Sequence, residues 1–335
     1  FHPVICEDGG RFRCITCRAS LAGRQFATLL PFMARLFFML ASWPLGLLHV
    51  IGAFLGWLVY ALSPSHRRRF RLHAQAAGLS LRQRWSAVAH NGRMVAELPR
   101  LWGRAQGTTL GQTVQWRHPE HIDQALAHGK GLILLTPHVG CFEIVAQAYA
   151  ERFGQTHPMT ALYRPAKQAW LAEIMEHARN RPGLLTAPAT LTGVRAMLRA
   201  LKNGQCTGLL PDQVPPEGMG VWAPFFGRPA YTMTMAAKLA QQTGATIVLM
   251  RGERLSFWQR LRQGCQYIIH AEAASADLTQ ALATGDPAQS AAAINRAMEH
   301  LIMQSPEQYL WGYNRYKGPR SEILTTADAK PGASA

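Results

Sequence analysis

Acidic residues are scarce in this chain of 335 residues. Aspartate and glutamate total 19 against 35 lysines and arginines, which gives a formal net charge of +16 and an isoelectric point near 10.2. A field of this sign favours nucleic acid, anionic lipid or an acidic protein as a partner, and composition alone does not choose among them. The length is enough to bury a sizeable core in one large domain or two modest ones.

Cysteine is also scarce, and its six residues are scattered, so no disulfide framework is indicated. Cys14 and Cys17 form one C-x2-C pair, but structural zinc needs four ligands and no second pair follows at a suitable spacing. The histidines His118, His121 and His128 lie in or beside an expected short helix at 119–128, and they are more typical of a solvated face. We therefore predict no metal site and no cofactor.

Several catalytic signatures are missing. The chain has no G-x-S-x-G sequence, which argues against a serine hydrolase of the α/β type, and it has no Walker A sequence. One glycine pattern, Gly218-x-Gly220-x-x-Ala223, nominally resembles a dinucleotide fingerprint. It follows Pro215-Pro216 and not a strand, so we reject this interpretation.

Formal charge is absent from the segment Leu36–Leu62, where His49 is the only potentially ionisable side chain. As one helix the segment would be about 40 Å long, enough to cross a bilayer core of about 30 Å with some tilt. We predict a membrane anchor at residues 33–62, with a single transmembrane helix. The alternative is a buried or interfacial hydrophobic helix, because length alone does not prove a span.

Arginine is concentrated directly after this segment. Residues 63–104 hold nine arginines and one acid, Glu97, which is half of the excess positive charge in about an eighth of the chain. By the positive-inside rule, this places the C-terminal body in the cytoplasm. The same arginines can hold anionic headgroups. Residues 1–32 precede Met33 and have little periodicity, and we interpret them as a non-native N-terminal extension, translated from a misplaced start.

The rest of the chain alternates between strand and helix patterns. Strands are expected at 132–136, 159–163, 207–210, 246–251 and 267–271, and helices at 141–152, 166–179, 190–202, 232–242 and 287–303. This order predicts an α/β fold with a mixed, mostly parallel sheet flanked by helices. We expect one catalytic domain at 63–318 and a flexible tail at 319–335.

The most informative segment is Gly131–Glu143. Its apolar run predicts a buried strand that ends at Pro137, and a helix follows from Cys141. His138 then lies at the carboxyl end of a strand and Glu143 in the first turn of the next helix, where open α/β sheets place their chemistry. A carboxylate beside a histidine can fix its tautomer and make it a general base, although the H-x4-E spacing alone is a weak signal.

Three further segments carry polar residues at strand ends or aromatic residues in loops. Arg164 ends the strand of Leu-Tyr-Arg-Pro and is well placed to bind an anion. Asp212 and Gln213 end another strand and open a loop, 214–233, which we interpret as an apolar channel or lid. Near the C-terminus, 306–317 joins aromatic and basic residues. Each segment also has a local interpretation, as surface charge, turn or core.

Together these motifs resemble the late acyltransferases of lipid A biosynthesis. The resemblance runs from about Met33 to Lys317 and includes T-P-H-x-G-x-x-E, L-Y-R-P, P-D-Q with F-F-G-x-x-A, and P-E-Q-Y-x-W. It implies a membrane-anchored enzyme of the glycerolipid-acyltransferase-like α/β fold. The implied reaction transfers a fatty acyl chain from acyl carrier protein to a hydroxyl of a lipid A precursor, an anionic glycolipid.

The resemblance also implies roles for individual residues. His138 is similar to the general base and Glu143 to its orienting acid, while Arg164 is similar to an arginine that binds substrate phosphate or helps the oxyanion. Asp212 and Gln213 are expected to shape the site and not to do chemistry. Tyr313 is a departure, because many members have histidine at this position.

Two other functions remain open. One is acyl transfer to another glycolipid or to an aminolipid, since the motifs report on donor chemistry better than on the acceptor. The other is a non-enzymatic, basic, membrane-anchored binding protein. We expect no nucleic-acid partner, because the arginines gather beside the apolar segment and no recognised nucleic-acid motif occurs.

Overall fold

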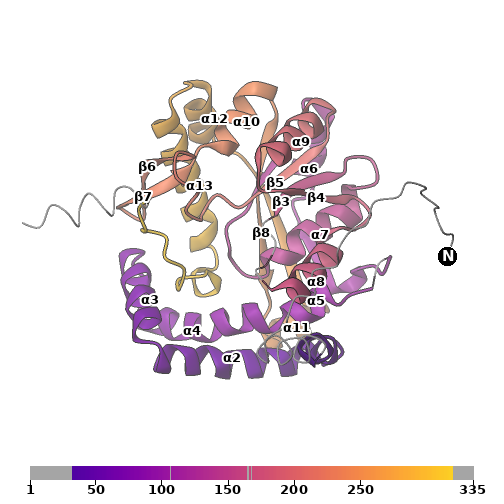
Figure 1. Cartoon of the computed structure of the whole chain (residues 1–335), viewed down its shortest axis with the longest axis vertical. Coiled ribbons are helices and arrows are strands. Elements are labelled where there is room, and N and C mark those ends of the chain that lie inside the picture. Colours follow the sequence, from indigo (N-terminus) through magenta and orange to yellow (C-terminus); the bar gives the residue numbers. More distant parts are fainter. Residues whose placement is uncertain (1–31, 106, 164–165, 167, 320–335) are drawn as a thin grey trace, which may run out of the picture.

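The computed structural model describes residues 32–319 apart from 106, 164–165 and 167 (Figure 1). The extension and tail predicted from sequence therefore fall largely outside the described residues. The helices are Phe32–Ala41, α2 (Leu45–Leu62), α3 (Pro64–Ala76), α4 (Leu81–Ala96), α5 (Leu98–Trp102), α6 (Glu120–Ala127), α7 (Phe142–Phe153), α8 (Ala169–Arg179), α9 (Leu191–Lys202), α10 (Met235–Thr243), α11 (Phe257–Gln263), α12 (Ala276–Ala283) and α13 (Pro287–Met303), with 3-10 turns η1 (Gly111–Thr113) and η2 (Pro306–Gln308).

A seven-stranded sheet forms the centre, in the order β1-β9-β8-β2-β5-β3-β4. Its strands are β1 (Val114–Arg117), β2 (Leu132–Leu135), β3 (Met159–Tyr163), β4 (Leu184–Pro188), β5 (Cys206–Leu209), β8 (Thr246–Arg254) and β9 (Tyr267–Ala273). Five strands, from β8 to β4, are parallel, while β9 is antiparallel to β8 and β1 is parallel to β9. The predicted fold class, a mostly parallel α/β sheet, is confirmed.

The central strand β2 is buried on both faces. Ile133 and Leu135 face one hydrophobic core, together with α9, α10, α12 and α13, while Leu132 and Leu134 face a second core with α6, α7 and α8. A continuous apolar strand is what a parallel sheet covered on both sides requires. The two layers of helices hold the carboxyl ends of β2 and β5 at one edge of the sheet.

The segment 214–233 is not the open loop that the sequence predicted. It contains an antiparallel hairpin, β6 (Gly220–Phe225) and β7 (Arg228–Met233), in which Trp222 lies opposite Tyr231. Asn295 of α13 donates a hydrogen bond of 2.9 Å to the Pro224 carbonyl and so fastens the hairpin to the domain. The prolines and glycine that indicated a loop lie at an edge, where strands tolerate them.

The apolar segment Leu36–Leu62 is not one helix either. It breaks between Ala41 and Leu45, because Pro44 has no backbone N–H to continue a helix, and α2 begins after it. Judged by length and composition, α2 is the one helix among the described residues that could cross a membrane. Its 18 residues extend about 27 Å. Figure 1 shows α2 and α4 lying side by side along one edge of the molecule.

Candidate active site

His138 and Asp212 meet because their strands are neighbours in register. Leu135 of β2 pairs with Leu209 of β5, and each polar residue follows three positions later. The His138 ring donates from Nδ1 to Asp212 Oδ1 at 2.7 Å, and the His138 backbone N–H donates to Asp212 Oδ2 at 2.9 Å. Both oxygens of one carboxylate therefore hold the same histidine, which fixes the position and tilt of its ring.

This arrangement defines the tautomer of His138. Ionised Asp212 can only accept hydrogen bonds, so the Nδ1 proton points to it and Nε2 keeps its lone pair. The Gln213 amide lies 3.0 Å from Nε2 and donates to that lone pair. The His138 side chain is 14% exposed, whereas that of Asp212 is 1% exposed. The histidine, and not the aspartate, is thus the part of the pair that a substrate can reach.

The surroundings keep Asp212 ionised. Burial alone would raise the pKa of this carboxyl, but the charge and hydrogen bonds of His138 and the charge of Arg315 lower it below its usual value. Arg315 is itself buried, and it donates to the Tyr231 carbonyl at 2.8 Å and to Thr232 Oγ1 at 2.7 Å. Phe142 packs against the His138 ring with centroids 4.7 Å apart. The negative charge of Asp212 is therefore maintained, and Phe142 forms an apolar wall on one side of the His138 ring.

The loop that carries His138 is attached to two other parts of the chain. The His138 carbonyl accepts from Leu310 N–H at 3.2 Å, and Gly140 N–H donates to the Gln308 carbonyl at 3.0 Å. Gly140 has a φ of +59°, and a Cβ there would lie 1.9 Å from the Gly252 carbonyl oxygen. Glycine is required at 140 by both conformation and space. The motif at 306–317 thus acts as a support for the histidine loop.

Glu143 does not have the partner that the sequence predicted. It lies in the first turn of α7, as expected, but its carboxylate forms a partly buried ion pair with Arg179, the last residue of α8. The carboxylate on His138 Nδ1 comes from Asp212 instead. Asp212 was expected only to shape the site, because the sequence does not state that β2 and β5 are adjacent. The register of these two strands accounts for both corrections.

The other predicted site residues are distributed as follows. Gln213 lies on His138, as described above, while Arg164 falls outside the described residues. Tyr313, which replaces a histidine common in the resembled family, accepts a hydrogen bond of 3.0 Å from Val214 N–H through its hydroxyl. It therefore anchors the chain directly after Gln213.

The sequence interpretation missed a buried charge cluster beneath the histidine loop. Glu97, at the end of α4, forms a two-pronged ion pair with Arg254 of β8 and accepts from Tyr267 Oη at 3.1 Å. Arg254 also donates to the Gly140 carbonyl at 2.9 Å. Glu97 was the one acid among nine arginines, and that isolation is the signal that could have marked it as an ion-pair partner.

Cys141 is close to His138 in sequence but is unsuited to act as a nucleophile. Its thiol is buried, and burial followed by the negative charge of Glu97 raises its pKa well above the usual value. A thiol becomes reactive when its pKa is lowered, so this one is inert. Across the described part of the chain, no group of three or more histidine, cysteine, aspartate or glutamate side chains is placed to hold a metal ion.

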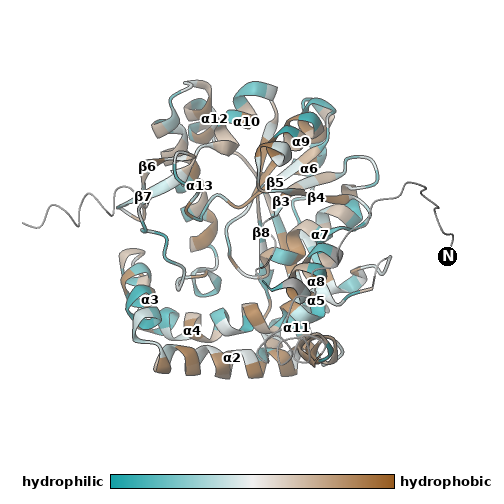
Figure 2. Ribbon diagram, in the orientation of Figure 1, coloured by the Kyte–Doolittle hydropathy of each residue, from teal (hydrophilic) through white to brown (hydrophobic). Residues whose placement is uncertain are grey.

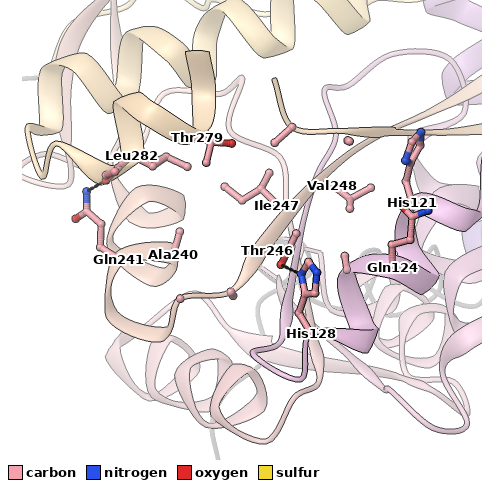
Figure 3. A pocket seen from close by; sticks show the side chains of 16 residues that line it. His121, Gln124, His128, Ala240, Gln241, Thr246, Ile247, Val248, Thr279 and Leu282 are labelled. Carbon is pink, nitrogen blue, oxygen red and sulfur yellow. Dashed lines mark hydrogen bonds between the residues drawn. The ribbon is translucent and has the colours of Figure 1, made fainter. Parts of the chain in front are cut away.

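A cleft of about 640 Å³ lies at the opposite edge of the sheet, beside the first residues of β8 (Figure 3). Figure 3 shows His128 and Thr246 facing one another in it, with 3.4 Å between Nδ1 and Oγ1, and His121 and Gln124 on α6 nearby. The cleft is at the amino ends of the strands, whereas ligands of such sheets bind at the carboxyl ends. We assign it no role in chemistry.

Comparison with known proteins points to one family. The model of the family described as bacterial lipid A biosynthesis acyltransferase matches residues 32–318. A lipid A biosynthesis acyltransferase of Haemophilus influenzae is 28% identical over 195 residues, covering 57% of this chain and 55% of its own length. A lipid A biosynthesis lauroyltransferase of Escherichia coli K12 is 28% identical over 199 residues, covering 59% and 60%.

A third relative, a lipid A biosynthesis palmitoleoyltransferase of Escherichia coli K12, is 25% identical over 244 residues and covers 71% of this chain and 74% of its own. The chain thus spans a little over half the length of the first two curated relatives. The family model, in contrast, extends over the whole described body, from the apolar helices to the motif that supports His138. On this match, the chain belongs to the bacterial lipid A biosynthesis acyltransferase family.

Proposed function

We propose that this protein is an O-acyltransferase that moves a fatty acyl chain from acyl carrier protein to a hydroxyl of a lipid A precursor. The observation that carries the proposal is the partly exposed His138 ring, which Asp212 holds at 2.7 Å through Nδ1 so that Nε2 keeps its lone pair. Family membership supports the acceptor class. The acyl-carrier donor rests on the chemistry of a thioester and on the basic surface, which suits an acidic carrier protein.

In the proposed reaction His138 acts as general base. An acceptor hydroxyl that takes the place of the Gln213 amide at Nε2 loses its proton to that nitrogen as its oxygen attacks the thioester carbonyl. The carbon–sulfur bond then breaks, and the proton passes from His138 to the departing thiolate, which gives an ester and a free thiol. A thioester is already activated, so a base of this kind, worth about 10² to 10⁴ in rate, is sufficient without a covalent enzyme intermediate.

Other residues have supporting roles in this proposal. Asp212 fixes the tautomer and stabilises the imidazolium form of His138. Glu143, through its ion pair with Arg179, positions α7 behind the histidine loop and so acts as a positioning residue. Arg164 remains predicted to bind an anionic part of the substrate. For location we propose the cytoplasmic face of the bacterial inner membrane, where the acceptor lipid is found.

The direct test is mass spectrometry of a lipid A precursor incubated with acyl carrier protein thioesters of several chain lengths. We expect a mass gain of one acyl chain with the unchanged protein and its loss with His138→Ala. His128→Ala is the matched control, because this histidine is exposed at the far edge of the sheet. No gain with any thioester would overturn the acceptor assignment, and equal gain with His138→Ala would remove His138 from the mechanism.

A further inference from the structure

One face of α2 is apolar and uncovered. Seven large side chains on it are between 41% and 73% exposed, and they recur every three or four residues, as one face of a helix requires. Figure 2 shows α2 as hydrophobic along the outer edge of the molecule. These residues are Leu47, Val50, Phe54, Leu55, Leu58, Val59 and Leu62.

The opposite face of α2 is closed against the domain. A Cβ added at Gly92 of α4 would lie 1.8 Å from the Gly52 carbonyl oxygen and 2.7 Å from the Gly56 nitrogen, so the two backbones touch. His49 is buried on this face and lies 3.1 Å from Glu97 Oε2 through Nε2. The one ionisable residue of α2 therefore belongs to the charge cluster that supports the histidine loop, and α2 is part of the catalytic body.

This packing is unsuited to a helix that crosses a bilayer. If α2 were upright in the membrane, α4 would enter it alongside, with Arg82, Arg84 and Arg93. An arginine at the centre of a bilayer is costly, because its charge is removed from water. A helix that lies in the plane of the surface avoids this cost, since only its apolar face enters the lipid to a depth of about 5–10 Å.

A second apolar projection lies beside α2. On α11, Phe257, Trp258 and Leu261 are 61%, 68% and 70% exposed, and the Phe257 and Trp258 rings are in contact, with centroids 5.2 Å apart. The Arg260 guanidinium of the same helix approaches Gly46 of α2, which places the two helices together. Aromatic and leucine side chains on a short basic helix are typical of a segment that enters the interface.

Arginines border this apolar surface. Arg67 donates to the Ala61 carbonyl at 2.8 Å at the end of α2, and Arg100 donates to the Trp43 carbonyl at 3.2 Å just before its start. Arg68, Arg71 and Arg82 are exposed on the adjoining helices. An apolar face with a rim of positive charge is complementary to a bilayer that carries anionic headgroups.

We propose that α2 and α11 form a monotopic seat on an anionic bilayer, with α2 lying in the plane of one leaflet. The seat adds detail to the membrane location in the proposed function. It is argued from the exposed apolar faces of α2 and α11 and does not depend on acyl transfer. It also has a consequence for the site. Arg254, at the carboxyl end of β8, bonds both Glu97 and Gly140, so the strand ends that carry His138 are directed toward the α2–α4 side. A lipid acceptor would then approach His138 from the leaflet in which α2 lies.

The seat can be tested by flotation of the purified chain with phosphatidylcholine vesicles that contain or lack phosphatidylglycerol. We expect binding that needs the anionic lipid and that Leu261→Ser weakens about tenfold, as loss of one buried leucine predicts. Leu191→Ser is the matched control, because Leu191 is 69% exposed on α9, away from the seat. Equal binding of the two variants would overturn the assignment of α11.

A second experiment separates a helix in the plane from one that spans. Cysteines are introduced at Ser42 and Ser65, which are exposed at the two ends of α2, in a chain whose Cys6, Cys14 and Cys17 are replaced by serine. Sealed membrane vesicles of each orientation are then treated with an impermeant maleimide. Labelling of both positions from the same side supports the seat, and labelling from opposite sides would show that α2 crosses the bilayer and would overturn it.

The outcomes also distinguish the seat from the proposed chemistry. Flotation and labelling need no acyl donor, so acyl transfer can fail while the seat holds, and the reverse is equally visible. The alternative occupant of the surface formed by α2 and α11 is a second copy of the chain. If Leu261→Ser converts a dimer into a monomer without changing flotation, the surface is a protein interface and the seat is wrong.

Discussion

Asp212 and Glu97 are both buried carboxylates with 1% of the side chain exposed, and both support the loop around His138. Asp212 is paired with the partly exposed His138, whose second nitrogen contacts only the neutral amide of Gln213 among the hydrogen bonds described above. Glu97 is paired with Arg254, which keeps its charge at all working pH values, and accepts further bonds from His49 and Tyr267. The partner of Asp212 keeps its second nitrogen, Nε2, for chemistry, whereas the partners of Glu97 serve to hold its carboxylate in place.

This difference suggests how the site divides its tasks. A general base needs a partner that holds it without taking its basic atom, and Asp212 does this from the Nδ1 side. A support needs a charge that does not titrate, and the Glu97–Arg254 pair provides it. Burial opposes ionisation of Glu97, but the charge and hydrogen bonds of Arg254, with those of His49, lower its pKa to about 2.

The largest expected effect comes from Asp212→Asn. The His138 backbone N–H is a fixed donor, so the new carbonyl is expected to face it and the amide NH2 to face Nδ1. The ring then carries its proton on Nε2 and has no base there. We expect kcat to fall about 10² to 10⁴-fold. A fall of less than tenfold would show that Asp212 does not set the tautomer.

Glu97→Gln tests the other half of the comparison. It leaves Arg254 buried without its counter-charge, which typically costs about 3–5 kcal/mol of stability. Denaturant unfolding measures this loss. Asp277→Asn is the control, since Asp277 and Arg296 form an exposed pair, for which about 0–1 kcal/mol is expected. Equal losses of unfolding free energy in the two variants would show that the Glu97–Arg254 pair contributes no more than an exposed surface pair.

The pH dependence of stability sharpens the picture around Glu97. Burial, followed by the charges of Arg254 and Arg93, lowers the pKa of His90 to about 3, from an ordinary value near 6.5. A group with a depressed folded pKa stabilises above its unfolded pKa, so this stability declines as pH falls below about 6.5 toward 3. Glu97 adds a further decline between about 4.5 and 2.

His90→Gln should therefore flatten the first of these declines. Between pH 6.5 and 4.5 the slope contributed by one proton is about 1.4 kcal/mol per pH unit, and the variant should lose it. Denaturant unfolding at a series of pH values measures the slope. If the slope is unchanged in the variant, other histidines are responsible for the acid sensitivity.

The smallest expected effect is that of Tyr313→Phe. It removes the hydroxyl that accepts from Val214 N–H at 3.0 Å, a bond worth about 0.5–1.5 kcal/mol. Because this hydroxyl holds the chain directly after Gln213, we expect a loss of stability of that size and only a small change in kcat. A loss of kcat as large as that of Asp212→Asn would instead give Tyr313 a part in the reaction.

Much of the fold could be predicted from local patterns. The strand ending before His138, the helix after Cys141, and helix α13 with its cap are local in origin; Asp286 accepts from Ala288 N–H at 2.9 Å, as an N-cap does. The strands β1 and β4 were missed, since each is short and each lies partly exposed at an edge of the sheet. The hairpin β6–β7 was read as a loop because its prolines and glycine are equally common in loops.

The sequence by itself determined which residues stand at strand ends, because apolar periodicity and punctuation by proline and glycine act over a few residues. It placed His138, Asp212 and Gln213 each just past a strand, and it concentrated arginine beside the apolar helix. Only the tertiary structure decided that β2 lies next to β5, which brings Asp212 to His138 and leaves Glu143 to Arg179. Strand order depends on packing between segments far apart in the chain, and no local pattern records it.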